Sequence, residues 1–292
     1  MVRVLDACPA CGARAAKVVA ELDDERRKRF LLYSQLKYSG LLTGWLSEIQ
    51  PVVTRCEGCG HCWYKEQPDD HQLSQMYASG NRLRPEIPMT RDPSDRMLLE
   101  MKRLRSLTTQ HTPRFLDYGS GFGRWARAAV QAGFEVYAFE PSQARGAEED
   151  MPFTLVHELN SLRGKVFDVV NLEQVLEHVP NPLEVLNGIK AFCHMDTFVR
   201  ITVPNILRCD EGAHIWREWP FDVQRVHTMA PFEHLHGFTP GSLRSVVRRA
   251  GFEPVGMMRL ASRYPGLAVR YWLGRWIPSL DNTFLIVRPF QV

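Results

Sequence analysis

A glycine-rich segment between a strand and a helix constrains the fold of this chain most. Residues 114–118 (RFLDY) have the composition of a buried strand, and DYGSGFG at 117–123 overlaps its end. Three closely spaced glycines allow a tight turn whose backbone N–H groups can approach a ligand at a helix N-terminus. The dinucleotide fingerprint would need glycine at position 124, where this chain has Arg124. The segment therefore predicts a ligand-binding strand–loop–helix unit that does not bind a dinucleotide.

Strands and helices alternate through the rest of this region. The pattern favours an α/β fold with a doubly wound, Rossmann-like, mostly parallel sheet of seven strands, and a ligand beyond the carboxyl ends of those strands. After the first strand, we expect strands at 135–139, 153–156, 166–172, 197–203, directly after Gly251, and at 283–287. Helices are expected over 93–107, from Gly123 to Gly133, from Pro182, and from Pro240 to Gly251, with capping residues at several of these ends.

Two acidic residues favour S-adenosylmethionine as the ligand. Asp117 lies two residues before the first glycine, where a carboxylate could meet the cationic amino group of the methionine moiety. Glu140 ends the second strand, 21 residues after Gly119. An acid at that position accepts hydrogen bonds from ribose hydroxyls.

The combined motifs resemble class I S-adenosylmethionine-dependent methyltransferases. The segments that carry the likeness are FLDYGSGFGRWA, the FE pair at 139–140 and FDVVNLEQVLEHVPNP, and it covers about residues 112–260. LEHVPNP and FEHLHGFTPGSLRSVVRRAGF are similar to ubiquinone-biosynthesis O-methyltransferases and their relatives, which act on small molecules. The resemblance implies that the amino-acid end of the cofactor is held by Asp117, Gly119, Ser120, Gly121 and Gly123, the ribose by Glu140, the adenine by Pro141 and Ser142, and the methyl side by Leu172, Glu173 and Gln174.

Four of the seven cysteines form two Cys-x-x-Cys-Gly pairs, Cys8 with Cys11 and Cys56 with Cys59. Four thiolates suit tetrahedral Zn²⁺, so the pairs predict a structural zinc site. A redox pair or a coincidence remains an alternative, because the spacer of 44 residues is long. That spacer indicates an insertion, with a helical pattern over 26–46. His61 or Cys62 could replace one of the four ligands, although residues next to such a site usually do not bind the metal. Cys193 and Cys209 have no spaced partner, and core packing accounts for them better.

The cysteine pairs also resemble the N-terminal zinc-binding domains of sugar methyltransferases, which favours a sugar or glycan acceptor. The domain boundaries we expect are a zinc-binding domain with a helical insertion at 1–80, a linker and helix at 81–111, and a methyltransferase domain at 112–292. Residues 205–237 form a long connection rich in aromatic side chains, as an acceptor lid would be.

Composition and charge limit the cellular location and the classes of partner that we expect for this protein. No stretch approaches the roughly 18 consecutive apolar residues of a membrane span, and the N-terminal residues lack a signal-peptide pattern. We therefore expect a cytoplasmic protein. The net charge of +3 is too small to indicate nucleic acid, and the basic run at 26–29 fits the solvated face of a helix. The sequence does not determine an oligomeric state.

Methyl transfer to a hydroxyl requires alignment of the acceptor and removal of its proton. Histidine is suited to the second task, and the candidates are His178, His214, His227, His234 and His236. We rank His234 and His178 first, although capping or core hydrogen bonding is a common role for any single histidine.

The leading interpretation is O-methylation of a small metabolite or a sugar or glycan hydroxyl, with S-adenosylhomocysteine as product. One alternative is an RNA methyltransferase whose zinc domain recognises RNA, for which only 26–29 and the basic aromatic tail at 259–276 offer support. Another is a non-catalytic scaffold that keeps the cofactor pocket.

Overall fold

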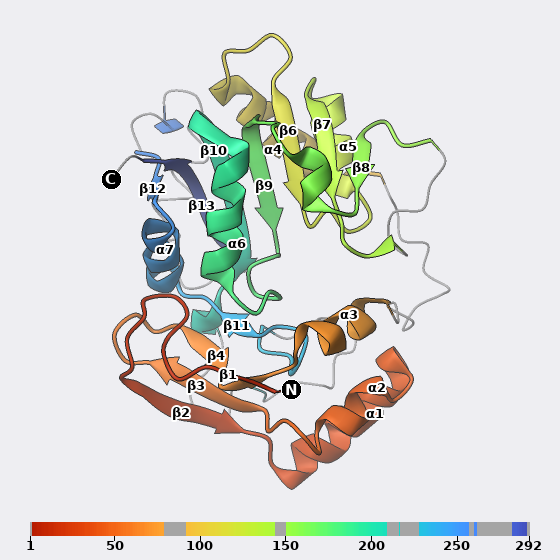
Figure 1. Cartoon of the computed structure of the whole chain (residues 1–292), viewed down its shortest axis with the longest axis vertical. Coiled ribbons are helices and arrows are strands. Elements are labelled where there is room, and N and C mark those ends of the chain that lie inside the picture. The colour runs from red at the N-terminus through yellow and green to blue at the C-terminus, as the bar shows by residue number, and fades with distance from the viewer. Residues whose placement is uncertain are drawn as a thin grey trace. The chain divides into compact units, whose positions relative to one another are not determined.

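The computed structural model describes residues 2–78, 92–143, 150–208, 216, 228–256, 260–261 and 282–290. Their contacts divide the chain into two compact units (Figure 1). Unit 1 comprises Met1–Pro88, Leu176–Pro182 and Pro204–Val246, and unit 2 comprises Met89–Val175, Leu183–Val203 and Val247–Val292. Among the described residues, no helix has the length and apolar character needed to cross a membrane.

Unit 2 is built on a seven-stranded sheet with the order β12-β13-β10-β9-β6-β7-β8. The four strand pairs from β10 through β8 are parallel, and β12 runs antiparallel to β13. The strands are β6 (Arg114–Tyr118), β7 (Glu135–Phe139), β8 (Thr154–Val156), β9 (Phe167–Glu173), β10 (Cys193–Pro204), β12 (Phe252–Pro254) and β13 (Asn282–Pro289). This confirms the predicted fold class.

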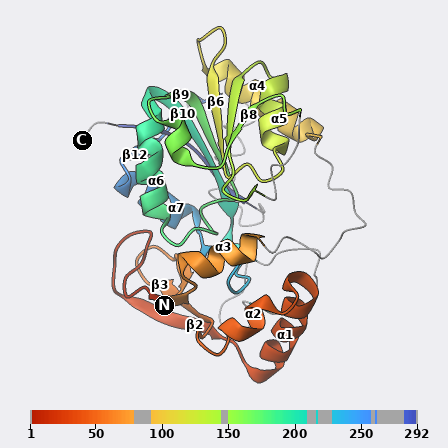
Figure 2. The same cartoon turned by 45° about the vertical axis from the view of Figure 1, so that its right-hand side comes forward.

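Helices cover both faces of this sheet. The buried side chains of α4 (Asp95–Leu107) and α5 (Arg124–Gln131) join one hydrophobic core with β6, β7 and β9. Helix α6 (Pro182–Ile189) lies on the opposite face (Figure 2), and α7 (Pro240–Arg249) precedes β12. Short 3₁₀ turns occur at η2 (Leu159–Leu162), η3 (Lys190–Phe192) and η4 (Ile206–Arg208).

Local signals account for these helix limits. Ser94 caps α4 by accepting a hydrogen bond from the Met97 backbone N–H, and α6 begins at Pro182, the first-turn position that proline favours. Gly133 and Gly251 follow α5 and α7 with positive φ, as expected for glycines that end helices. Strand β10 begins four residues before the expected Thr197, because an irregular register between Cys193 and Phe198 extends its pairing with β9.

Unit 1 contains a four-stranded antiparallel sheet with the order β11-β4-β3-β2 and a two-stranded pair of β1 and β5. Its strands are β1 (Arg3–Val4), β2 (Ala16–Glu21), β3 (Val52–Cys56), β4 (Cys62–Tyr64), β5 (Glu66–Gln67) and β11 (His236–Gly237). Its helices are α1 (Asp24–Tyr38), α2 (Leu41–Trp45) and α3 (Asp70–Ala78). Helices α1 and α2 lie between the two cysteine pairs, in the segment where the sequence has a helical pattern.

The core of unit 1 joins residues that are far apart in the sequence. Phe232 packs edge-on against Phe30 and Trp45, with ring centroids 5.6 Å and 5.4 Å apart. Strand β11 pairs with β4, so that Gly237 lies opposite Cys62. The structure therefore groups residues 228–237 with the N-terminal segment, whereas the sequence boundaries assign them to the second domain.

Several sequence predictions fall outside the described residues. They are most of the linker at 79–91, the lid at 209–215 and 217–227 with His214 and His227, Cys209, and the tail at 259 and 262–276.

Candidate functional site

The glycine loop connects β6 to α5 in unit 2. The backbone N–H groups of Gly119 and Ser120 both donate to the Phe139 carbonyl at the end of β7, over 2.8 Å and 3.0 Å. At Gly119, with φ of +73°, an added Cβ would lie 2.9 Å from Val175 Cγ2, and at Gly123, with φ of +75°, it would lie 2.6 Å from Phe153 Cζ. Glycine is required at both positions by conformation and by space.

Glu140 holds the tip of this loop. Its carboxylate accepts hydrogen bonds from the backbone N–H of Gly121, over 2.9 Å, and of Ser142, over 3.0 Å, and the residue is 5% exposed. Among the described residues, an added Cβ on Gly121 would meet no atom within 4 Å. The acid predicted from the sequence thus lies beside the glycine loop.

Asp117 is the buried acid of the site. Its Oδ1 accepts a hydrogen bond from Asn171 Nδ2 over 2.8 Å, and among the described residues its Oδ2 has no hydrogen-bond partner. Burial raises the pKa of Asp117 to about 7; the nearby Glu173 carboxylate also raises it, while the Asn171 hydrogen bond and Arg200 lower it. The carboxyl group therefore titrates close to neutral pH.

The sequence analysis missed Asn171 and Arg200. Arg200 is almost fully buried and donates to Asn171 Oδ1 over 2.8 Å and to Glu173 Oε2 over 2.5 Å, with its guanidinium 4.5 Å from the Trp125 ring centroid. The only sequence signal was an arginine within the apolar run TFVRITV. These contacts orient Asn171 toward Asp117 and compensate the charge of Glu173.

The other residues that the resemblance assigned to the cofactor differ in their environments. Leu172 is fully buried and Pro141 is exposed. Gln174 has φ of +54°, and its backbone N–H donates to the Thr202 carbonyl over 2.9 Å. Ser120, Ser142 and Gln174 each have a buried side-chain polar atom with no hydrogen-bond partner among the described residues. These atoms could bind polar groups of a ligand.

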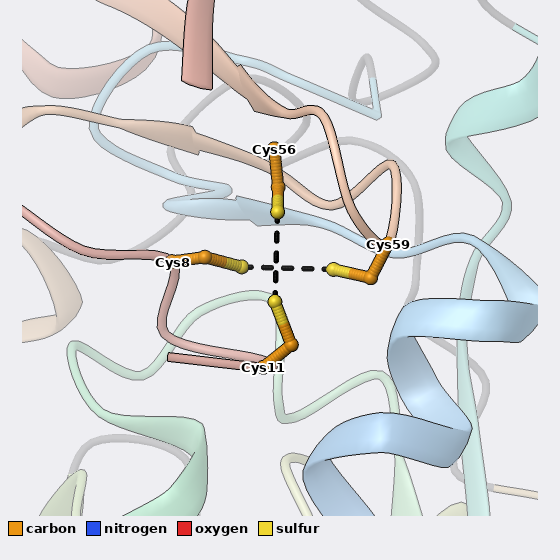
Figure 3. A group of neighbouring side chains, drawn as sticks. All are labelled: Cys8, Cys11, Cys56 and Cys59. Atoms are coloured by element: carbon orange, nitrogen blue, oxygen red, sulfur yellow. Dashed lines mark hydrogen bonds between the residues drawn. The ribbon is translucent and has the colours of Figure 1, made fainter. Parts of the chain in front are cut away.

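The four cysteines of the two pairs come together in unit 1, as Figure 3 shows. Each sulfur is near one from the other pair: Cys8 Sγ lies 3.6 Å from Cys59 Sγ, and Cys11 Sγ lies 3.5 Å from Cys56 Sγ. Gly12 and Gly60 have positive φ, and their N–H groups donate to the Cys8 and Cys56 carbonyls. The cysteines thus lie on two matching turns, as expected for a metal site.

The pKa values of two thiols in this cluster shift in opposite directions. A hydrogen bond from Cys59 lowers the pKa of Cys8 to about 5, with help from the backbone N–H groups of Cys11 and Ala10, and the same bond raises the pKa of Cys59. Negative charge is therefore stabilised at Cys8. Cys62 and Cys193 lie outside the cluster, and burial raises the pKa of Cys193 to about 12.

The two histidines ranked first also come together in unit 1. The ring centroids of His178 and His234 are 4.5 Å apart, with the rings nearly perpendicular. The fully buried Glu177 completes a group whose three candidate ligand atoms lie within 4.8 Å of one another. The sequence analysis missed Glu177, although it directly precedes His178 in LEHVPNP.

His236 and His61 form a separate buried pair. His61 Nε2 lies 3.3 Å from His236 Nδ1, and His236 Nε2 lies 3.3 Å from the Pro180 carbonyl oxygen. Burial lowers the pKa of His236 to about 4 and that of His61 well below its ordinary value. Both rings are therefore neutral at physiological pH and pack within unit 1.

A third buried group links α1 to the segment before β11. Lys37 Nζ donates to Glu233 Oε2 over 2.7 Å and to Tyr33 Oη over 2.8 Å, and Tyr33 Oη donates to the other carboxylate oxygen of Glu233. Burial raises the pKa of Tyr33, and the Glu233 charge raises it further. This ion pair fixes the residue that directly precedes His234.

Comparisons with known proteins find several methyltransferases that are similar to this chain. A ubiquinone biosynthesis O-methyltransferase of Bordetella avium (strain 197N) is 28% identical over 158 residues, which cover 49% of this chain and 64% of that protein. A solved plantazolicin methyltransferase, BpumL, has a TM-score of 0.46 at 14% identity, covering 91% of this chain and 98% of that one. A Burkholderia thailandensis 1,6-didemethyltoxoflavin-N1-methyltransferase has a TM-score of 0.42 at 17% identity, covering 67% of this chain and 79% of that one.

The family assignment rests on a longer match. Residues 89–256, more than half of the chain, match the model of a methyltransferase domain family. The matched span includes the glycine loop, Asp117 and Glu140. The chain therefore belongs to the methyltransferase domain family, in agreement with the class I S-adenosylmethionine-dependent methyltransferases that its sequence resembles.

Proposed function

We propose that this protein transfers a methyl group from S-adenosylmethionine to a hydroxyl oxygen of a small metabolite or a sugar. The observation that carries the proposal is the glycine loop of a methyltransferase-family domain, tied at its tip to the Glu140 carboxylate. The Bordetella relative, named as an O-methyltransferase of ubiquinone biosynthesis, supports oxygen as the methylated atom.

The residues present fit the cofactor. The Asp117 carboxylate has an oxygen without a partner among the described residues, which suits the cationic amino group of a methionine moiety. Glu140 would hold the ribose hydroxyls, Pro141 and Ser142 the adenine, and the backbone from Gly119 to Gly123 the amino-acid end. S-adenosylmethionine supplies a methyl group on a sulfonium sulfur, a good leaving group, so the protein chiefly has to align the acceptor.

Leu172, Glu173 and Gln174 would line the methyl side. The backbone there is fixed by the bond from Gln174 N–H to Thr202, and Glu173 is held by Arg200. A wall of these residues, in which Arg200 compensates the Glu173 charge, would exclude water from the methyl carbon of the cofactor.

We assign proton removal from the acceptor to the His178–His234 pair. The Nδ1 atoms of both rings lie near backbone carbonyl oxygens, at 2.7 Å for His178 and 3.3 Å for His234, which leaves each Nε2 with a lone pair that can accept a proton. S-adenosylmethionine would supply the methyl group to the acceptor oxygen and leave as S-adenosylhomocysteine, while the histidine pair would take the hydroxyl proton.

We further propose that Cys8, Cys11, Cys56 and Cys59 hold a structural Zn²⁺ ion. Two glycine turns with four converging sulfurs are the donor set that zinc prefers. The zinc-stabilised unit would contribute to acceptor recognition, in a reducing compartment such as the cytoplasm.

The test of this function is methyl transfer by the full chain and by His234→Gln. Labelled methyl should enter a hydroxyl-bearing small molecule with the native protein and fall by about 100-fold or more with the variant, while S-adenosylhomocysteine affinity stays unchanged. His194→Gln, a substitution of a partly exposed histidine in unit 2, is the matched control and should retain activity. Undiminished transfer by His234→Gln would remove the assignment of the base.

A further inference from the structure

Arg200 of β10 is a buried cation surrounded by acidic and aromatic side chains of unit 2. The residue is 3% exposed, and its Nη1 donates to Asn171 Oδ1 over 2.8 Å and to Glu173 Oε2 over 2.5 Å. Its Nε lies 3.5 Å from Glu100 Oε1 of α4, and its guanidinium lies 4.5 Å from the Trp125 ring centroid. A buried charge is costly unless it is paired and hydrogen-bonded, so these contacts keep Arg200 charged and hold it in one orientation.

The contact with Arg200 determines which way the Asn171 amide faces. A guanidinium can only donate, so the atom of Asn171 that it contacts is the carbonyl oxygen, and the amide nitrogen faces away from it. That nitrogen donates to Asp117 Oδ1 over 2.8 Å. The register agrees, because Asn171 lies directly opposite both Asp117 of β6 and Arg200 of β10. Two hydrogen bonds therefore link Arg200 to Asp117 across three neighbouring strands (Figure 1).

An Asn171 amide held in this orientation favours the ionised form of Asp117. A carboxylate can only accept and is matched by an amide N–H, whereas a reversed amide would present its oxygen and favour the protonated acid. Burial, the largest influence, raises the pKa of Asp117 to about 7; the Asn171 hydrogen bond and the Arg200 charge lower it, and the Glu173 charge raises it. Glu100 contacts Arg200 from α4. A change in this balance therefore alters the charge of Asp117 at neutral pH.

We propose that Arg200 is a positioning residue for S-adenosylmethionine, which orients the Asn171 amide and thereby keeps Asp117 as the carboxylate that receives the cationic amino group of the cofactor. The proposal rests on the cofactor-binding part of the proposed function. Asn171 holds Asp117 Oδ1, and the buried Oδ2 has no hydrogen-bond partner among the described residues. One oxygen is thus fixed by the protein, and the other faces the ligand.

The pH dependence of S-adenosylhomocysteine affinity separates this role from a merely structural one. Calorimetric titration of the full chain at pH 6 and pH 8 compares the native protein with Arg200→Gln, which removes the cation. If the pKa of Asp117 rises from about 7 to about 8 in this variant, affinity should fall about ninefold at pH 6 but only about twofold at pH 8. A loss of packing alone would lower affinity by the same factor at both pH values. Arg114→Gln, which replaces a half-exposed arginine at the other end of β6, is the matched control and should keep native affinity at both.

Arg200→Lys is a second variant, which keeps the buried charge and therefore the fold. A lysine retains a cation beside Glu173 and Glu100, but its shorter side chain places the nitrogen short of the Nη1 position and weakens the bond to Asn171. Affinity should fall about threefold at pH 6 and stay near the native value at pH 8. Circular dichroism and thermal unfolding of the cofactor-free protein establish which variants fold.

Losses of affinity that are larger at pH 6 than at pH 8 in the folded variants would support the proposal. Equal losses at the two pH values, or native affinity in the folded variants, would overturn it. Neither result affects methyl transfer by the native protein, which is measured separately. Binding with the expected pH dependence, without methyl transfer to any hydroxyl compound, would instead refute the proposed O-methylation and leave the role of Arg200 standing.

Discussion

Titration of Asp117 should control cofactor affinity near neutral pH. In the free protein, burial raises the pKa of this carboxyl to about 7. If the ionised carboxylate pairs with the amino group of the cofactor, only that form binds well, so affinity should rise with pH. The apparent dissociation constant then scales as one plus the ratio of protonated to ionised Asp117. This factor is about 11 at pH 6 and about 1.1 at pH 8, a tenfold difference worth about 1.4 kcal/mol.

Calorimetric titration with S-adenosylhomocysteine between pH 6 and pH 8 measures this effect. Asp117→Asn should bind more weakly at pH 8 and lose the pH dependence. Glu135→Gln, which removes an exposed carboxylate at the other end of the neighbouring strand, is the matched control and should keep the native slope. An unchanged slope in Asp117→Asn would refute the pairing, as would affinity that falls with rising pH in the native protein.

The same residue makes an independent prediction for stability. Between about pH 4 and pH 7 an unfolded chain has lost the Asp117 proton, whereas the folded chain retains it. Unfolding therefore releases a proton, and the stability of the cofactor-free protein should fall by a few kcal/mol at most as pH rises through this window. Asp117→Asn should remove that fall in thermal or denaturant unfolding, and an identical pH profile for the variant would contradict the buried-acid assignment.

Three further predictions concern glycine, zinc and charge. Gly119→Ala should lower the free energy of unfolding by about 2–4 kcal/mol, because the added Cβ both strains a residue of positive φ and overlaps Val175. Gly133→Ala should lower it by only about 1–2 kcal/mol, because the φ is also positive but no described atom lies within 4 Å of the added Cβ. Equal losses in the two variants would argue against a steric clash at Gly119. Cys56→Ser should abolish retention of zinc against a mild chelator, measured by elemental analysis, and retained zinc would exclude Cys56 as a ligand. Lys37→Met should cost about 3–5 kcal/mol in denaturant unfolding by leaving Glu233 buried without its cation. Adding Glu233→Gln should recover most of that loss, and failure to recover it would indicate a packing effect instead.

The parts of the fold that depend on local sequence could be predicted. Strand β7 has the expected limits, Glu135–Phe139, and α6 begins at the expected Pro182. The glycine loop and the cysteine turns were recognisable for the same reason, because a few adjacent residues determine each turn. Glycine after the second cysteine of each pair has the positive φ that this turn requires.

The parts that depend on strand register could not be predicted. Asn171 lies directly opposite Asp117 of β6 and directly opposite Arg200 of β10, which places these three polar side chains side by side across the sheet. Recognising that group requires the strand order and the register, neither of which follows from the spacing of residues along the chain. A lone arginine or asparagine in an apolar run remains ambiguous until its neighbours are known.

The packing of residues 228–237 into unit 1 was also missed. Helix α1 and the segment containing Phe232 and Glu233 pack against each other in one core. The apolar residues of each could equally pack against other apolar surfaces of the protein. The sequence predicted a lid from the aromatic content of 205–237, but the described part forms core and strand contacts with the N-terminal segment. This packing between distant segments depends on how their side chains fit together and on the Lys37–Glu233 ion pair. The spacing of apolar residues within either segment does not reveal these contacts.

Transfer of labelled methyl from S-adenosylmethionine into a fractionated host extract tests the central claim most directly. Small molecules, glycans, RNA and protein are separated after incubation with the full chain, and a Gly119→Ala protein serves as the loss-of-binding control. The account predicts label in a hydroxyl-bearing small molecule or glycan, at an oxygen, and none with the control. Label only in RNA or protein, or at nitrogen or carbon alone, would contradict it.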